Sequence, residues 1–291
     1  TLDQAGLFTA TSYAGSGANL TNLPSDVTVS ATAPSSPSQG DLWFNSATVA
    51  VSGIGIKAMA VYNGTSWEQA SNTVFSATGG TITNYSGYRV HTFTSSGTFT
   101  PNSSGTVDAL VIAGGGAGAA DGSTTPGNGG GGAGGMYVIP GKTVVAQAYS
   151  IVVGAGGAGD LNSGDSGNNS SALGFTALKG GGGGWYANTP GQGGNGTYGS
   201  GGGGGPSSSA DSIGTNSNDG TNYHYGNNGA GGSGAGGGGG GGAGAAGSGI
   251  NAGAGRNNNY RTGSNITYAG GGGGGTNGTY GTANGGGGSG K

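Results

Sequence analysis

The chain has 291 residues and a formal net charge of −3, and only 6 % of its residues are charged. A nucleic-acid partner would require a basic stripe, so this balance argues against one. The absence of cysteine excludes a disulfide framework and thiolate metal sites. No apolar run approaches the ~20 residues that span a bilayer, so we expect a chain that does not cross a membrane.

Two short units are expected before residue 74. Residues 1–28 are expected to form the first unit, in which apolar and small polar side chains alternate over Leu7–Tyr13, as suits a strand. Residues 29–73 are predicted to form a small β module in which Trp43 and Trp67 pack the core. Its predicted strands and hairpin turn are 41–45, 54–62 and Asn63-Gly64.

Residues 74–179 hold the most strand-like sequence and are predicted to be the β-rich part of a glycine-rich domain. Pro140-Gly141 is expected to turn one strand into the next and so make an antiparallel pair. His91 falls in an alternating strand, where a structural role is expected. No segment has a helical period. The predicted strands are Tyr88–Phe93, Gly97–Thr100, Val107–Ala113, Met136–Ile139, Val144–Val153 and Ala172–Leu178.

Glycine dominates the rest of the chain: 68 of the 80 glycines lie from Gly114 onward. Glycine buries almost no side-chain surface and loses the most backbone entropy on ordering. Such a stretch is either a disordered linker, which needs no regular period, or a lattice held together by its backbone. A bundle of three-fold, polyproline II-type helices would require glycine at every third, inward-facing position.

Each long run contains such a glycine phase. Phases occur at Gly193, Gly196, Gly199, Gly202 and Gly205; at Gly226, Gly229, Gly232, Gly238, Gly241, Gly244 and Gly247, with Ala235 departing; and at Gly272, Gly275, Gly278, Gly281, Gly287 and Gly290, with Asn284 departing. Together with the interleaved apolar strands, these phases favour the lattice over the linker. We therefore predict an all-β fold with little or no helix, in which short strands lead into a polyglycine II helix bundle over residues 180–291.

Several segments resemble proteins of bacteriophage fibres. The segments similar to the glycine-rich domain of phage tail fibres and adhesins are YRVHTFTSSGTFTPNSSGTVDALVIAGGGAG (88–118), GGGGAGGMYV (129–138), YSIVVGAGGAG (149–159) and SGNNSSALGF (166–175). SYAGSGANLTNLPS at 12–25 is similar to shaft repeats of phage fibres. Residues 33–67 resemble a short module common in fibre proteins of cyanobacterial and other marine phages.

The resemblance implies an elongated virion appendage, located outside the cell, whose glycine-rich part is a polyglycine II sandwich. It implies that aromatic-rich loops at one end bind a host cell-surface receptor, either a glycan or an outer-membrane protein, as in the adhesins of T-even-like phages. It also implies contacts with other virion tail proteins. Fibre shafts of this kind are homotrimers, which we adopt as the expectation, whereas some sandwich tips are monomers.

The aromatic islands between the glycine runs are the candidate receptor-binding residues. We expect them at turns, where the chain reverses and side chains point outward, and Tyr and Trp offer rigid contact area. Capping of the bundle ends explains any single one equally well, but the segment TNYHY at 221–225 favours binding. The candidates are Trp185, Tyr186, Tyr198, Tyr223, His224, Tyr225, Tyr260, Arg261, Tyr268 and Tyr280.

No catalytic or metal-binding pattern is evident. DLNSGD at 160–165 lacks the spacing and the Glu of a calcium loop, and His224 has no second histidine nearby. GGGGSGK at 285–291 lacks the Ser/Thr, the strand and the helix of a phosphate-binding loop. We expect no enzyme, no metal and no cofactor.

Two other functions compete with receptor binding. A purely structural virion fibre or extracellular fibril protein would need the lattice but no receptor contact. A glycine-rich antifreeze bundle would need regularly spaced Thr or Ala on one side, whereas the interruptions here are irregular and aromatic.

Overall fold

The computed structural model describes residues 27–70, 75–120, 127–159, 163–185, 191, 198–208, 213–215, 217–218, 222–276 and 279–282. Within these ranges the chain contains strands and no helix, which confirms the predicted all-β class. The chain divides into one unit of residues 1–74 and another of residues 75–291. The strand expected at Leu7–Tyr13 lies outside the described residues.

The first unit is a four-stranded sheet with the order β1-β2-β3-β4. Trp43 is fully buried and meets Trp67 edge-on with the ring centroids 5.5 Å apart, which confirms the predicted core. Gly64, with φ +97°, lies in the predicted turn after Asn63, and Asn63 Oδ1 accepts hydrogen bonds from two backbone amides of this turn. The strands are β1 (Val27–Ser30), β2 (Leu42–Asn45), β3 (Met59–Tyr62) and β4 (Trp67–Gln69).

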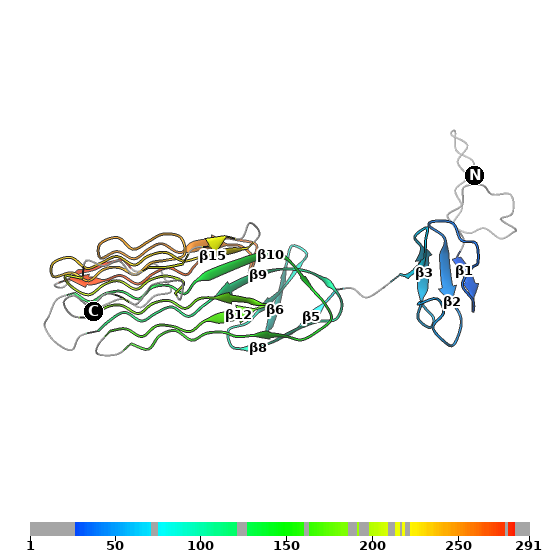
Figure 1. The fold of residues 1–291 in the computed structure, drawn as a ribbon, viewed down its shortest axis with the longest axis horizontal. Coiled ribbons are helices and arrows are strands. Elements are labelled where there is room, and N and C mark those ends of the chain that lie inside the picture. The colour runs from blue at the N-terminus through cyan, green and yellow to red at the C-terminus, as the bar shows by residue number, and fades with distance from the viewer. Residues whose placement is uncertain are drawn as a thin grey trace, which may run out of the picture. The chain divides into compact units, whose positions relative to one another are not determined.

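Within the described residues, the second unit contains two larger sheets and four two-stranded hairpins. Figure 1 labels several of their strands, among them β9, β10 and β15. The larger sheets have the orders β14-β15-β10-β9 and β11-β8-β5, and the hairpins are β6–β7, β12–β13, β16–β17 and β18–β19. The strands are β5 (Ala77–Thr78), β6 (Thr81–Tyr85), β7 (Tyr88–Thr92), β8 (Gly97–Pro101), β9 (Gly105–Ile112), β10 (Met136–Val144), β11 (Tyr149–Ile151), β12 (Ser170–Ala172), β13 (Phe175–Ala177), β14 (Ser217–Asn218), β15 (Tyr223–Tyr225), β16 (Arg256–Asn258), β17 (Ile266–Tyr268), β18 (Gly275–Thr276) and β19 (Thr279–Tyr280).

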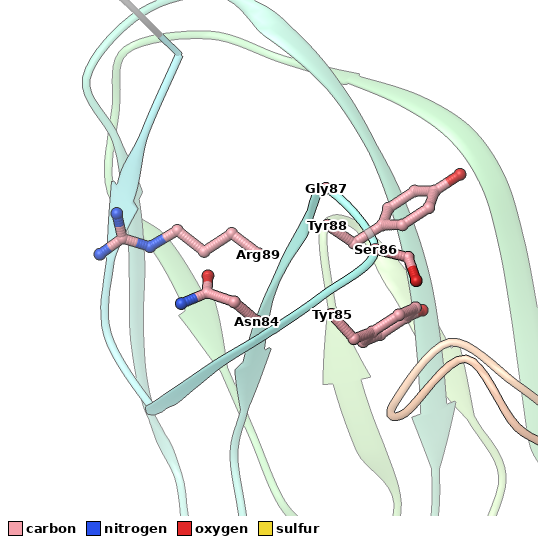
Figure 2. A pocket seen from close by; sticks show the side chains of 6 residues that line it. All are labelled: Asn84, Tyr85, Ser86, Gly87, Tyr88 and Arg89. Carbon is pink, nitrogen blue, oxygen red and sulfur yellow. The ribbon is translucent and has the colours of Figure 1, made fainter.

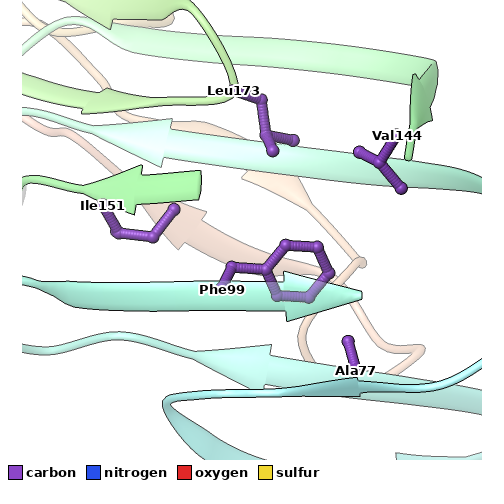
Figure 3. Close-up of a cluster of buried hydrophobic side chains, with 5 residues drawn as sticks. All are labelled: Ala77, Phe99, Val144, Ile151 and Leu173. Carbon is purple, nitrogen blue, oxygen red and sulfur yellow. The ribbon is translucent and has the colours of Figure 1, made fainter. Parts of the chain in front are cut away.

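Side chains from these strands form small apolar clusters. In one of them, Phe99 lies among Ala77, Val144, Ile151 and Leu173 (Figure 3). His91 has the expected structural role next to this cluster, because its Nδ1 lies 2.7 Å from the carbonyl oxygen of Gly79 and its ring meets Phe99 edge-on. The β-rich part of the second unit is thus stabilised by ordinary side-chain packing.

Two of the predicted strand arrangements were wrong. Pro140-Gly141 does not turn the chain back, because β10 continues through it with a bulge between Ile139 and Lys142. The Gly141 amide donates to Asp108 Oδ1 at 2.8 Å, and proline needs no partner for the amide proton that it lacks. The strand expected at 172–178 is instead the hairpin β12–β13, turned by Leu173 and Gly174 at positive φ.

Beyond the strands, runs of the second unit lie side by side (Figure 1) and bond to one another at every third residue. Ala113, Gly116 and Ala119 donate from their amides to the carbonyls of Gly135, Gly132 and Gly129. Gly237, Gly240 and Ala243 donate in the same way to Gly275, Gly272 and Ala269. A step of three residues along both partners is that of the three-fold helix, which has no hydrogen bonds of its own. The predicted period is confirmed in the described runs, whereas the predicted phase positions Gly193, Gly196, Gly278, Gly287 and Gly290 lie outside the described residues.

The run 237–242 lies inside this lattice and is enclosed on three sides. A Cβ added at Gly237 or Gly240 would overlap the backbone of 128–132. At Gly238 or Gly241 it would overlap 227–231, and at Gly239 or Gly242 it would overlap 251–254. The sequence predicted one glycine-only phase in each run, but here neighbouring backbones enclose all three phases. This explains why the whole run is glycine.

Candidate functional site

The structure places the sequence-predicted candidates in several different surroundings. Tyr186 lies outside the described residues, and Tyr280 is described only as backbone of β19. Trp185 is half-buried at the end of a glycine run. Tyr198 is also half-buried, and the Lys179 Nζ lies 5.1 Å from the centroid of its ring.

The segment Tyr223–Tyr225 was predicted to be a turn, and that prediction was wrong. These residues form β15, which pairs antiparallel with β10, with Tyr225 opposite Met136 and Tyr223 opposite Val138. Alternating tyrosine and histidine rings suit a pleated strand, and β10 offers an edge to which β15 can bond. The pleat puts Tyr223 and Tyr225 on one face of the sheet and His224 on the other.

His224 faces the interior and is only 2 % exposed. Its Nε2 accepts a hydrogen bond from the Leu178 amide at 3.2 Å, and its ring packs against Tyr137. Burial lowers the pKa of His224, and the backbone of Thr215 opposes part of that change. The imidazole is therefore held neutral as a structural acceptor, and its burial leaves it no surface for contact with a receptor.

On the other face, tyrosine and arginine side chains stack into a ladder. The rings of Tyr223 and Tyr225 lie 6.0 Å apart and are tilted by only 6°. Arg256, from β16, places its guanidinium carbon 3.8 Å from the centroid of Tyr225. A planar cation over a tyrosine face is attracted by the ring quadrupole. Two strands that are distant in sequence thus contribute to one stacked surface.

The turn between β16 and β17 extends this surface. Tyr260 and Arg261 lie in that turn, as predicted. Burial raises the pKa of Tyr260, and the electrostatic effects of Asp108 and Tyr225 raise it further. The Tyr85 hydroxyl, at the tip of the β6–β7 hairpin, donates to the Tyr260 carbonyl at 2.9 Å.

The hairpin tip adds two further tyrosine rings. Tyr85 and Tyr88 lie 5.5 Å apart between centroids, and Tyr88 is 60 % exposed. Figure 2 shows both rings on one side of the tip, with Asn84 and Arg89 on the other, around a shallow pocket of about 370 Å³. We use the name tyrosine cluster for Tyr85, Tyr88, Tyr223, Tyr225 and Tyr260 together with Arg256.

Tyr268 belongs to the core beside the cluster rather than to its surface. It lies opposite Arg256 in the β16–β17 hairpin and packs near Met136 and Ala269. Its hydroxyl oxygen is buried. The predicted binding role of Tyr268 therefore has less support from its position than that of Tyr260.

Sequence reasoning missed four contributors to this region: Tyr85, Tyr88, Asp108 and Arg256. Tyr85 and Tyr88 flank Ser86-Gly87, a turn signal between two alternating strands, which could have identified them as a pair at a hairpin tip. Arg256 and Asp108 carry no comparable local signal. Their role depends on strands that only the folded chain brings together.

A groove of about 1100 Å³ adjoins the cluster. It is lined by β9, by the β6–β7 hairpin, by β11 and β12, and by the 259–263 turn. Its lining includes Val90, Phe93, Val107, Leu110 and Val153, so it is largely apolar at the base. The chemistry that this region offers is stacking, apolar burial and hydrogen bonding.

In the described part of the chain, no three His, Asp or Glu side chains gather as metal ligands would. Nor do the described ranges hold a helix that is long and apolar enough to cross a membrane.

No curated protein matches the chain. A family model described as a glycine-rich domain matches residues 93–291, which is more than half of the sequence. The matched part contains β8 to β19, the runs of the lattice and every member of the tyrosine cluster except Tyr85 and Tyr88. The chain therefore belongs to the glycine-rich domain family.

Proposed function

We propose that this chain is a bacteriophage tail-fibre or adhesin protein that binds a host cell-surface receptor through the tyrosine cluster. The observation that carries the proposal is the stacked ladder of Tyr223, Tyr225 and Arg256 on a scaffold of bonded glycine runs. The resemblance of the sequence to phage fibre proteins supports the same assignment. The proposed location is the virion tail, as a homotrimer joined to other tail proteins.

Tyrosine suits this role because it offers a large flat surface with few rotatable bonds and a hydroxyl group at its end. The apolar faces of sugar rings stack on such surfaces, and Arg256 and Asp108 add charged hydrogen-bonding groups beside them. Among the two receptor classes, a glycan therefore fits this surface better than an apolar protein loop.

The lattice contributes rigidity. Binding costs free energy when side chains and loops must be ordered, and a surface that is already fixed avoids part of that cost. Tyr223 and Tyr225 are held by the pairing of β15 with β10, and Tyr260 by the hydrogen bond from Tyr85. The proposed surface thus consists largely of strand and hairpin residues, whereas the resemblance implied aromatic-rich loops at one end. A receptor contact by Trp185, Tyr186 or Tyr280 stays a prediction.

The test is binding of the fluorescently labelled full chain to intact cells of a panel of bacteria that includes cyanobacterial and other marine strains. On a strain that binds, the double variant Tyr223→Ala/Tyr225→Ala should bind at least about tenfold more weakly, since central aromatic contacts can each contribute 2 kcal/mol or more. Purified surface glycans and outer-membrane proteins of that strain should then compete to different degrees, with the glycans more effective.

Tyr198→Ala is the matched control, because Tyr198 also has a cation over its ring but is not a member of the tyrosine cluster. It should bind like the parent protein. Thermal unfolding of all variants shows whether the fold is kept. If the folded double variant binds cells as tightly as Tyr198→Ala, the tyrosine cluster is not the receptor site.

A purely structural fibre remains the second candidate, and the lattice itself favours it. Hydrogen bonds between neighbouring runs in several directions make a stiff element whether or not any receptor exists. This function predicts that the chain binds no cell of the panel above the level of an unrelated protein.

A further inference from the structure

Among the strands of the described residues, β9 lies at the edge of its sheet and pairs with β10 alone, in the order β14-β15-β10-β9. The Ala113 amide donates to the Gly135 carbonyl, which sets the phase of the pairing. In an antiparallel pair, successive residues alternately direct their backbone groups toward the partner strand and away from it. Val111 therefore bonds to β10, whereas Leu110 and Ile112 direct their amides and carbonyls away from β10.

Just after the end of β9, the backbone groups that point away from β10 have hydrogen-bond partners in the lattice. Gly114 is in the same outward phase, and its amide donates to Asn168 at 3.0 Å while its carbonyl accepts from Gly180 at 2.8 Å. In the described part of the chain, the strand pairing of Leu110 and Ile112 is with β10 alone, so it leaves their outward groups without a partner strand. The pairing therefore stops at the border of the lattice although the strand continues.

Beside this edge lies the groove described above, which β9 and the β6–β7 hairpin both line. These two elements belong to different sheets and are not bonded to each other. Strands in a sheet are spaced about 4.8 Å apart, and a groove of about 1100 Å³ is large enough for an extended segment. At its rim, Phe75 is 37 % and Val152 is 43 % exposed.

We infer that the free edge of β9 accepts an extended segment of a partner protein, which adds to the sheet as a further β-strand. A small ligand would leave successive backbone groups unpaired, whereas a strand satisfies them in order. Val107 and Phe93 both line the groove and pack against the cluster around Phe99, so one face of an added strand would meet apolar side chains, which favours a segment with apolar side chains at alternate positions. An uncovered apolar edge of this kind is otherwise a site of aggregation. This inference does not depend on the proposed receptor binding.

The probes are synthetic heptapeptides with Val, Ile or Leu at alternate positions and Thr or Lys between them, tested on the full chain by fluorescence anisotropy. Leu110→Pro removes the outward amide proton and leaves the Val111 bonds to β10 in place, because proline is tolerated at a sheet edge. We expect this variant to bind the peptides at least about tenfold more weakly. Leu110→Ala is the matched control: it shortens the side chain but keeps the amide, and should bind much more tightly than Leu110→Pro.

Hydrogen exchange of the unmodified chain gives a second readout that needs no variant. Bound peptide should slow exchange at the Leu110 and Ile112 amides and leave Val111, already bonded to β10, unchanged. The inference is overturned if no peptide of the set binds, or if bound peptide leaves both amides unprotected. It is also overturned if light scattering shows a dimer that Leu110→Pro dissociates, because a second copy would then cover the edge.

Discussion

The sheet of the first unit and the glycine lattice of the second achieve a packed interior by opposite means. In the first, Trp43 fills the centre and is fully buried together with Ile54 and Ala60. In the second, the run 237–242 has no side chains at all, and neighbouring backbones lie where side chains would be. One interior depends on the volume of side chains, whereas the other depends on their absence.

The two regions should therefore be destabilised by opposite kinds of substitution, the first by removing side-chain atoms and the second by adding them. Removing atoms from a side-chain core leaves a cavity and loses apolar burial. Adding a single carbon to a backbone-packed core forces bonded runs apart. The following predictions test whether the two interiors differ in this way.

The largest effect is expected from Trp43→Ala. Deleting a fully buried tryptophan should lower the free energy of unfolding of the first unit by about 3–5 kcal/mol. Urea denaturation followed by tryptophan fluorescence and circular dichroism measures it. Val49→Ala is the control, because Val49 is 61 % exposed and should change stability by less than about 0.5 kcal/mol. Equal effects of the two variants would contradict a side-chain core.

The second effect is expected from Gly240→Ala, in which the added methyl group overlaps the Gly131 carbonyl. We expect a loss of about 2–3 kcal/mol in the second unit, because the overlap is with backbone and cannot be relieved by a rotamer change. Gly159→Ala is the matched control, since no heavy atom lies within 4 Å of a Cβ at that position. Thermal unfolding should separate the two variants, and similar midpoints would refute enclosure of the run.

The smallest effect is a pH dependence from His224. Burial lowers its pKa in the folded chain below the ordinary value of 6.5, which applies to the unfolded chain. As the pH falls below about 6.5, the unfolded chain takes up a proton that the folded chain refuses, so stability is lost in acid and is fully present above that pH. The slope from this residue is at most about 1.4 kcal/mol per pH unit.

The variant His224→Gln tests this assignment. Glutamine can still accept the hydrogen bond from the Leu178 amide but does not titrate between pH 4 and 8. Urea denaturation at a series of pH values should therefore show a smaller loss of stability in acid for the variant than for the parent. An unchanged loss would mean that other groups cause it.

The sequence predicted the fold to the extent that local patterns determine it. Val107–Ala113 reads as a strand because an apolar run ends at three glycines, and it is found as most of β9. The three-residue period of the glycines could be recognised in the sequence because a Cβ at many lattice positions, such as Gly237 and Gly240, would overlap a neighbouring backbone. The prediction of a turn at Pro140-Gly141 was wrong because the conformation there depends on Asp108 of β9, which accepts a hydrogen bond from the Gly141 amide.

The candidate site was less accessible to sequence reasoning. Tyr223–Tyr225 reads as an island between glycine runs, and only the free edge of β10 makes it a strand. The alternation that buries His224 and stacks the two tyrosines follows from that pairing. Arg256 lies over Tyr225 because β15 and β16 meet in the folded chain. The local sequence around Arg256, GRNNNYR at 255–261, contains no pattern that predicts this contact.

The composition of the lattice also determines how its stability responds to temperature. Unfolding a side-chain core exposes apolar surface, which raises the heat capacity, whereas unfolding bonded glycine runs exposes mainly peptide groups, which lowers it. For a given number of residues, the enclosed run 237–242 and its neighbours thus contribute less to the heat-capacity change than the strands around Phe99 do. A domain built largely of such runs has a flatter stability curve and loses less of its stability in the cold than a side-chain-packed domain of equal length.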